Sequence, residues 1–160
     1  MEIADTYEFL LGDWTLTRWI EDRRTGLSGR FIGRATLVET TGGCGWYTEE
    51  GELSYKGYAG PANRMLQVLR QSDGTAVLHF SDGRPYVVVD LSTANWSGRH
   101  LCWRDTYEID MQARSESVVL EQWRVRGPAK CYDALAFLYR AESRVEIPSQ
   151  IRTKQIDIGH

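Results

Sequence analysis

The sequence has few cysteines and no excess of charge, and these absences exclude several classes of protein. Its 160 residues include only three cysteines, Cys44, Cys102 and Cys131, at wide spacing and without a CxxC pair. A disulfide framework is not expected, so the thiols should be reduced. The 19 basic and 22 acidic residues give a formal charge of −3. This balance lacks the basic excess typical of a nucleic-acid partner or an anionic membrane surface.

Long apolar runs and a secretory leader are also missing. No stretch approaches the roughly 20 apolar residues that span a bilayer, and the start at Met1 has neither a basic flank nor an apolar segment. We therefore expect a cytoplasmic protein without a nucleic-acid or membrane partner. A phosphate-binding glycine loop, an HExxH helix, a GxSxG elbow and a dinucleotide fingerprint are all absent from the sequence. No metal and no cofactor are predicted.

The residues that are abundant favour a sheet. Six Trp and eight Tyr in so short a chain suit a pleated surface. Asp5 to Gly12 predict one short helix, with Asp5 as its cap, Glu8 completing a capping box and Gly12 at its end. After Gly12, bulky residues recur at every second position in roughly ten stretches separated by turn residues. We expect one all-β domain, a single antiparallel barrel of about ten strands at residues 13–140, with an extension at 141–160.

The clearest turn is the Asp-Gly pair at 82–83, which provides the positive φ angles of a tight two-residue hairpin. The turn sets the register of the strands on either side. It predicts two facing pairs, Phe80 with Pro85 and Leu78 with Val87. The other face of the hairpin then carries His79 and Tyr86.

Five motifs resemble those of a family of short bacterial proteins of unknown function with a calycin-like barrel. They are FLLGDW at 9–14, GRFIGRA at 29–35, SDGRPY at 81–86, HLCWRDTY at 100–107 and WRVRGPAKCY at 123–132. They follow the order of that family over about residues 7–140. The Gly-x-Trp start is also similar to the lipocalin and fatty-acid-binding superfamily. This resemblance implies a barrel that encloses one small, mostly apolar ligand.

The same resemblance implies a role for two residues at the bottom of the barrel. In that superfamily, the Trp after the short helix closes the bottom of the barrel and a basic residue of the last strand covers it. The matching residues here are Trp14 and Arg140, and a cation over an indole face stabilises by about 0.5 to 2 kcal/mol. We predict a structural role for this pair. The sequence departs from the family pattern at Gln67, Val87 and Cys131, which indicates a specialised ligand.

The apolar face of each stretch, taken as the interior, places several polar side chains inside. Arg18 and Glu49 are in phase with apolar neighbours, as is Glu121. A buried carboxylate must be paired or protonated. Glu49 is therefore either half of a structural ion pair with Arg18 or a polarised acid or ligand anchor. Two inward alanines, Ala134 and Ala136, indicate a cavity.

The phase also gives a set of residues that would contact a ligand. The set is Arg18, Tyr47, Gln67, Trp96, Cys102, Trp123 and Tyr132. Gln67 belongs to it because it shares a predicted inward face with Met65 and Leu69.

His100, Cys102, Asp105 and Tyr107 form the densest group of reactive side chains. A metal site would need more ligands than lie nearby, and same-face neighbours roughly 7 Å apart do not readily form a Cys-His nucleophile pair. We favour a hydrogen-bonded corner, in which Asp105 caps the turn as a structural residue. His100 and Tyr107 then offer donors to each other or to a ligand.

Three functions remain open at this stage. The first is binding of a small, largely hydrophobic organic molecule inside the barrel, by a monomer or a homodimer. The second is a cofactor-independent cyclase or isomerase, with Glu49, Tyr107 and His100 as candidate catalytic residues, because cavity shape and one or two hydrogen bonds can accelerate such reactions. The third is a protein-interaction module that uses exposed Trp19 and Trp46. A shared fold does not decide among the three.

Overall fold

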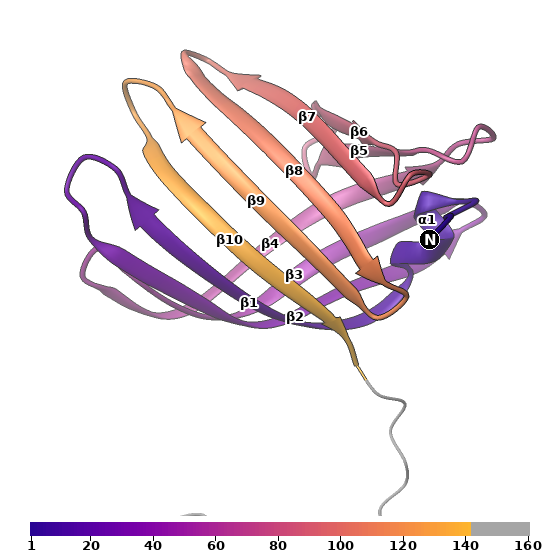
Figure 1. Ribbon diagram of the computed structural model, residues 1–160, viewed down its shortest axis with the longest axis horizontal. Helices are drawn as coiled ribbons and strands as arrows, with labels where there is room; N and C mark the ends of the chain where they lie inside the picture. Colours follow the sequence, from indigo (N-terminus) through magenta and orange to yellow (C-terminus); the bar gives the residue numbers. More distant parts are fainter. Residues whose placement is uncertain (142–160) are drawn as a thin grey trace, which may run out of the picture.

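Alternation of apolar and polar residues builds ten strands of one antiparallel sheet in the computed structural model, which describes residues 1–141 (Figure 1). The predicted barrel and its N-terminal helix are confirmed. The predicted extension lies outside the described residues, apart from Ala141. The elements are α1 (Thr6–Leu10), β1 (Gly12–Asp22), β2 (Ser28–Thr41), β3 (Cys44–Tyr55), β4 (Tyr58–Arg70), β5 (Ala76–Phe80), β6 (Pro85–Val89), β7 (Asn95–Cys102), β8 (Asp105–Ser115), β9 (Val118–Arg126) and β10 (Cys131–Arg140).

The sheet is a meander that closes on itself almost completely. The strand order is β6-β5-β4-β3-β2-β1-β10-β9-β8-β7, so the first and last strands pair and the two edges of the sheet are β6 and β7. The two edge strands approach each other but are not paired by backbone hydrogen bonds. Side chains bridge them instead. His100 Nδ1 on β7 lies 3.2 Å from the carbonyl oxygen of Tyr86 on β6, and the two rings stack with their centroids 5.2 Å apart. We call this junction the seam.

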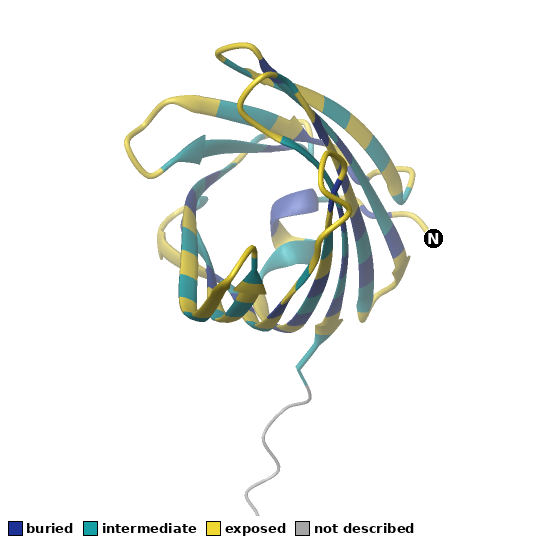
Figure 2. Ribbon diagram, turned by 90° about the vertical axis from the view of Figure 1, so that its left-hand side faces the viewer, coloured by how far each residue is buried: buried dark blue, intermediate teal, exposed yellow. Residues whose placement is uncertain are grey.

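The helix α1 lies across one end of the barrel, which we call the closed end. Figure 2 looks in from the opposite, open end and shows the helix at the far side of the lumen. Asp5 caps the helix by accepting from the backbone N–H of Glu8. Glu8 does not complete the capping box. It pairs with Arg70 at 2.8 Å, and Arg70 also binds Asp5 at 2.7 Å, so β4 holds the helix in place.

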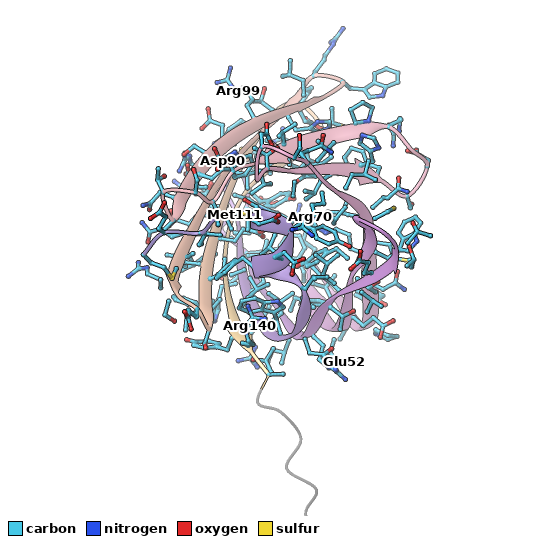
Figure 3. All side chains as sticks on the ribbon, turned by 90° about the vertical axis from the view of Figure 1, so that its right-hand side faces the viewer. Glu52, Arg70, Asp90, Arg99, Met111 and Arg140 are labelled. Carbon is cyan, nitrogen blue, oxygen red and sulfur yellow. The ribbon has the colours of Figure 1, made fainter. Side chains whose placement is uncertain are left out.

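The predicted partnership of Trp14 and Arg140 is present at the same end. The guanidinium carbon of Arg140 lies 4.1 Å from the centroid of the Trp14 ring. Arg140 also donates to the backbone oxygens of Phe9, Leu11 and Glu116. It lies on the other side of α1 from Arg70 (Figure 3). One side chain therefore joins the last strand to the helix, to the first strand and to the β8–β9 turn.

Two facing glycines allow the backbones of β2 and β3 to approach each other closely. Gly33 pairs with Gly51. A Cβ atom on Gly33 would lie 2.0 Å from the Glu50 oxygen, and one on Gly51 would lie 2.2 Å from the Ile32 oxygen. No side chain fits in so short a space, because close approach of two backbones requires glycine.

Two details of the predicted strand registers are wrong. Leu78 faces Val87 as predicted, but Pro85 pairs with His79 and not with Phe80, because a bulge interrupts the hairpin after Leu78. The bulge turns Tyr86 into the barrel, where it lines the same wall as Val87. It therefore does not share the outer face with His79. One extra residue in one strand produces such a reorientation.

The predicted phase of β4 is also wrong. Met65 is 45% exposed on the outer face, whereas Arg64, Leu66 and Val68 line the interior. Both alternating sets contain apolar residues, so hydrophobicity alone selects the wrong face. A shift of one residue moves every side chain of a strand to the opposite side. Gln67 accordingly leaves the predicted set of lining residues.

Candidate functional site

Four charged side chains from four strands meet halfway along the barrel and form what we call the charged layer. Arg18 comes from β1, Glu49 from β3, Arg64 from β4 and Glu121 from β9. Glu49 and Arg64 occupy directly paired positions. Arg18 and Glu121 flank Ala136 on the strand between them, and the small alanine leaves room for the guanidinium to reach the carboxyl group.

Glu49 is the best-satisfied group of the layer. Its two oxygens accept from Arg18 Nη1 and Nη2 at 2.9 and 3.0 Å. Tyr47 donates its hydroxyl at 2.8 Å, and Arg64 Nη2 donates at 3.2 Å. Burial alone would raise the pKa of the Glu49 carboxyl group, but the two guanidinium groups and these hydrogen bonds lower it to about 2. Glu49 is therefore held as a carboxylate.

Glu121 is in a different electrostatic situation. It accepts one hydrogen bond from a described residue, from Arg18 Nη2 at 3.1 Å. Burial raises the pKa of its carboxyl group, and the charge of Glu49 adds to this effect, while Arg18 and Arg64 oppose it. The two carboxyl groups of the layer thus have pKa values shifted in opposite directions, a pattern that marks candidate functional sites.

Trp123 holds the two arginines of the layer in place. The guanidinium carbons of Arg18 and Arg64 lie 4.4 and 4.6 Å from the centroid of its ring. Each such contact stabilises by roughly 0.5 to 2 kcal/mol, more when the cation is desolvated. The indole thereby fixes two like charges that would otherwise repel each other.

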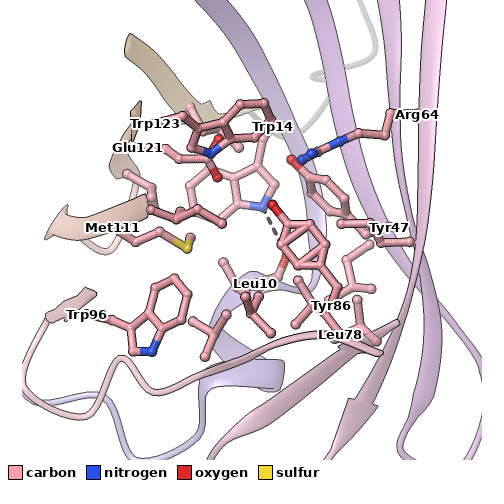
Figure 4. A pocket seen from close by; sticks show the side chains of 18 residues that line it. Leu10, Trp14, Tyr47, Arg64, Leu78, Tyr86, Trp96, Met111, Glu121 and Trp123 are labelled. Carbon is pink, nitrogen blue, oxygen red and sulfur yellow. Dashed lines mark hydrogen bonds between the residues drawn. The ribbon is translucent and has the colours of Figure 1, made fainter. Parts of the chain in front are cut away.

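Below the layer, toward the closed end, the barrel encloses an apolar space that we call the chamber (Figure 4). Its cavity volume is about 50 Å³. Arg64 and Glu121 of the layer form its ceiling together with Trp123, Tyr47 and Tyr86. The remaining wall is almost wholly apolar and consists of Leu10, Trp14, Leu37, Leu66, Val68, Leu78, Val87, Val89, Trp96, Ile109, Met111, Val119 and Leu138.

Above the layer, the barrel widens into a funnel that opens to solvent at the open end. By the same measure its volume is about 290 Å³. Arg18, Glu49 and Arg64 form its floor, and Tyr132 and Lys130 lie on its wall. The side chain of Arg64 is 30% exposed, whereas those of Arg18 and Glu49 are less than 10% exposed. Arg64 is therefore the member of the layer that contacts both spaces and solvent.

The structure brings together most residues that the sequence placed inside. Arg18, Glu49 and Tyr132 line the funnel, Tyr47 and Trp96 line the chamber, and Trp123 lines both. Gln67 lies outside both spaces, where its amide nitrogen is 3.6 Å from Cys44 Sγ.

The group around His100 forms part of the seam and does not line the chamber. His100 stacks on Tyr86 and lies 6.1 Å from Tyr107 between ring centroids. The Tyr107 hydroxyl accepts from Lys130 Nζ at 2.9 Å. Asp105 accepts from the backbone N–H groups of Ala129 and Lys130. It therefore caps the β9–β10 turn, whereas the sequence analysis predicted that it caps the turn between His100 and Tyr107. Cys102 is half-buried beside Asp105 at the end of β7.

Two residues of the chamber's ceiling, Arg64 and Tyr86, escaped the sequence analysis. Arg64 was missed because the opposite phase of β4 appeared equally apolar. Tyr86 was missed because the bulge that turns it inward has no clear sequence signal. The charge pattern offered one clue to Arg64, because Glu49 and Glu121 together require more positive charge than Arg18 supplies.

Comparisons with known proteins give a family and a fold. The model of a family of unknown function (DUF6314) matches residues 10–140. No curated protein matches the sequence. In the part of the chain that the structure describes, no helix has the length and apolarity needed to cross a membrane.

Several solved structures are similar in shape. The S-type phycobiliprotein lyase CPES from Guillardia theta has 10% sequence identity and a TM-score of 0.54, over 90% of this chain and 95% of that one. A redesigned barrel, mFAP0, bound to DFHBI has 13% identity and a TM-score of 0.47, over 82% and 99% of the two chains. A protein of unknown function of the DUF3598 family from Nostoc punctiforme has 10% identity and a TM-score of 0.43, over 85% and 49%. The likeness to the lyase shows a shared barrel fold.

Proposed function

We propose, for a chain that belongs to DUF6314, a family of unknown function, that the protein binds a small, largely hydrophobic organic molecule inside its barrel. The observation that carries this proposal is the chamber, which is apolar on every side except its ceiling. Ligand sites commonly combine an apolar wall with a few placed polar groups. The chamber has this composition.

The size of the chamber limits what fits without rearrangement. A free volume of about 50 Å³ corresponds to roughly three to five water-sized spheres. A protein cavity that binds benzene measures about 150 Å³, so a single substituted ring fits only if the side chains around the chamber move apart. Each apolar Å² that such a ring removes from water stabilises the complex by about 25 cal/mol, before the entropy of association is subtracted. A larger ligand would have to extend into the funnel past Arg64.

The test is native mass spectrometry of the protein purified from its own host, followed by denaturation and identification of any released molecule. We expect an apolar metabolite bound to the native protein. Val87→Phe should abolish this bound mass, because Val87 lines the chamber and a phenyl group would fill it.

The neighbouring substitution Val88→Phe is the matched control. Val88 is 53% exposed on the outer face of the same strand, so its replacement should leave the bound mass unchanged. A native protein that carries no ligand, and that also fails to bind added single-ring compounds, would contradict the proposal.

A second candidate is a cofactor-independent isomerase or cyclase. One observation favours it, namely that burial raises the pKa of the Glu121 carboxyl group at the ceiling of an apolar chamber. Carboxyl groups tuned in this way act as general acids. Glu49, a candidate from the sequence, is held ionised by four hydrogen bonds and so is poorly suited to donate a proton. Conversion of the recovered metabolite by the native protein, lost in Glu121→Gln, would support this activity. Unchanged return of the metabolite would support binding alone.

A further inference from the structure

The two buried carboxyl groups of the charged layer are satisfied to very different extents. Glu49 accepts four hydrogen bonds. Glu121 is 9% exposed and accepts one, through Oε1. Its Oε2 has no hydrogen bond to any residue in the range 1–141. A carboxylate offers about four acceptor positions, and a buried one that is poorly paired costs free energy. Glu121 therefore has capacity for a further donor.

The position of Glu121 directs this capacity toward the chamber. Glu121 lines the chamber, whereas Glu49 lines the funnel. Glu121 projects from the same face of β9 as Trp123, and both side chains lie along the ceiling (Figure 4). Across the sheet its partner is Met111, whose thioether belongs to the apolar wall. A ligand in the chamber thus meets the carboxyl group of Glu121 at the ceiling, while the wall below it is apolar.

The charges of the layer argue against an anionic ligand. Arg18 binds both carboxyl groups and Arg64 binds Glu49, so the two positive charges already face two acidic groups. Arg64 Nε and Trp123 Nε1 are buried without an acceptor among residues 1–141, but a carboxylate that reached them would lie beside Glu121. Like charges at short distance in a buried site are strongly unfavourable.

We infer that the ligand of the chamber is an uncharged apolar molecule with one hydrogen-bond donor, of the phenol or alcohol class, and that Glu121 accepts that hydrogen bond. This inference rests on the proposed function. A hydroxyl group suits the site in either protonation state of Glu121, because it donates to a carboxylate and accepts from a carboxylic acid.

The test compares three ring compounds of similar size: toluene, p-cresol and p-toluate. Binding is followed by NMR of protein labelled with ¹³C in the methionine methyl groups, of which the chain has three. Met111 lines the chamber and should report binding. Met1 and Met65 are 55% and 45% exposed, and their signals should not move.

We expect p-cresol to bind at least about tenfold more tightly than toluene, since a hydrogen bond to a charged group contributes at least this factor. Water solvates the hydroxyl group of p-cresol better than the ring hydrogen that it replaces in toluene, so a gain must come from a bond inside the protein. We expect no shift of Met111 with p-toluate. Equal affinity for toluene and p-cresol, or tightest binding of p-toluate, would overturn the inference and leave the proposed function standing. Failure of all three compounds to move Met111 would overturn both.

Substitutions assign the preference to Glu121. Glu121→Leu should remove the preference for p-cresol and preserve toluene binding, and Glu121→Gln should reduce the preference. Toluene binding serves as the check that these variants fold. Gln122→Leu, at the exposed neighbouring position of β9, is the matched control and should retain the preference. A preference that persists in Glu121→Leu would overturn the assignment.

Discussion

Single residues inside the barrel show how charge can be buried without loss of the fold. Burial of an ion costs several kcal/mol, and only good geometry with further hydrogen bonds compensates it. Glu49 meets this condition with four donors. Arg18 meets it in part, through a bidentate contact with Glu49 and a third contact with Glu121, while its Nε has no hydrogen-bond partner among the described residues.

Removal of the Glu49 charge should therefore destabilise the protein. Glu49→Gln leaves Arg18 and Arg64 buried with one negative charge fewer, and we expect a loss of about 3 kcal/mol in the free energy of unfolding. Urea denaturation measures the change. Glu50→Gln, at the exposed adjacent position of β3, should change the free energy by less than about 0.5 kcal/mol. Equal effects of the two substitutions would contradict the account of the layer.

The pH dependence of stability should also show the contribution of ionised Glu49. The pKa of Glu49 falls from an ordinary 4.5 to about 2 in the folded protein. A lowered folded pKa gives stabilisation that is complete above the unfolded pKa and is lost as the pH falls through the folded one. Between about pH 5 and pH 2, the free energy of unfolding of the unmodified protein should fall by up to about 3 kcal/mol through Glu49. Glu49→Gln should not show this part of the decrease. Denaturation curves over this range measure the difference, and parallel curves would be inconsistent with a paired Glu49.

At this scale the sequence allowed a partial prediction of the site. Arg18 and Glu49 could be placed together because both interrupt apolar alternation with opposite charge. Arg64 could not, because Leu66 and Val68 on one face of β4 and Met65 and Leu69 on the other are equally apolar. Hydrophobic pattern fixes a strand face only where the two faces differ.

Among the elements, the two edge strands differ from the rest. β6 and β7 each pair on one side only, and the seam between them is closed by side chains. Tyr86 stacks on His100 and packs against Phe80 with ring centroids 4.8 Å apart. The bulge in the β5–β6 hairpin aims Tyr86 at this position. Side-chain contacts thus replace the missing backbone ladder.

Loss of the Tyr86 ring should open the seam locally. Tyr86→Ala removes contacts of a half-buried ring, and we expect a loss of about 2 kcal/mol in stability. Amide hydrogen exchange should become faster in β6 and β7 and stay unchanged in β1 and β10, since local opening follows weak contacts. Tyr139→Ala, at a position 48% exposed on β10, should leave the exchange of β6 and β7 as it is. Uniform acceleration in Tyr86→Ala would mean that the seam is not a separate unit.

The hairpin at 82–83 shows what turn chemistry can predict. The Asp-Gly pair correctly located the turn and the pairing of Leu78 with Val87. The predicted two-residue loop is wrong, because the Phe80 N–H donates to the Arg84 oxygen and encloses three residues, of which only Gly83 has a positive φ. The bulge one residue closer to the turn reversed the orientation of Tyr86. Bulges depend on the curvature of the whole barrel, and local sequence does not contain that information.

At the scale of the whole molecule, closure depends on contacts between the first and last strands of the described chain. β1 pairs with β10 over nine residue pairs, from Trp14 with Arg140 to Asp22 with Tyr132. The fold class could be predicted in full, because ten alternating stretches joined by short turns leave few arrangements other than a barrel. The seam could not be predicted, because which two strands form the edges depends on how all ten strands pair in the complete sheet.

Arg140 should be the most sensitive residue of the closed end. Arg140→Met removes its hydrogen bonds to the helix and the cation above Trp14. We expect the free energy of unfolding to fall by about 2 kcal/mol, which thermal unfolding measures. Arg34→Met removes an exposed ion pair with Asp13 and should cost less than about 1 kcal/mol. A smaller effect at Arg140 than at Arg34 would refute its role in closing the barrel.

The central claim is that the chamber under the charged layer is a ligand site, and a crystal structure with bromobenzene tests it most directly. Anomalous scattering locates the bromine atom without reference to the protein. The account predicts one strong bromine peak inside the barrel, between Met111, Leu66 and Trp96 and below Glu121. Bromine found only in the funnel or on the outer surface, with the chamber unchanged, would contradict it.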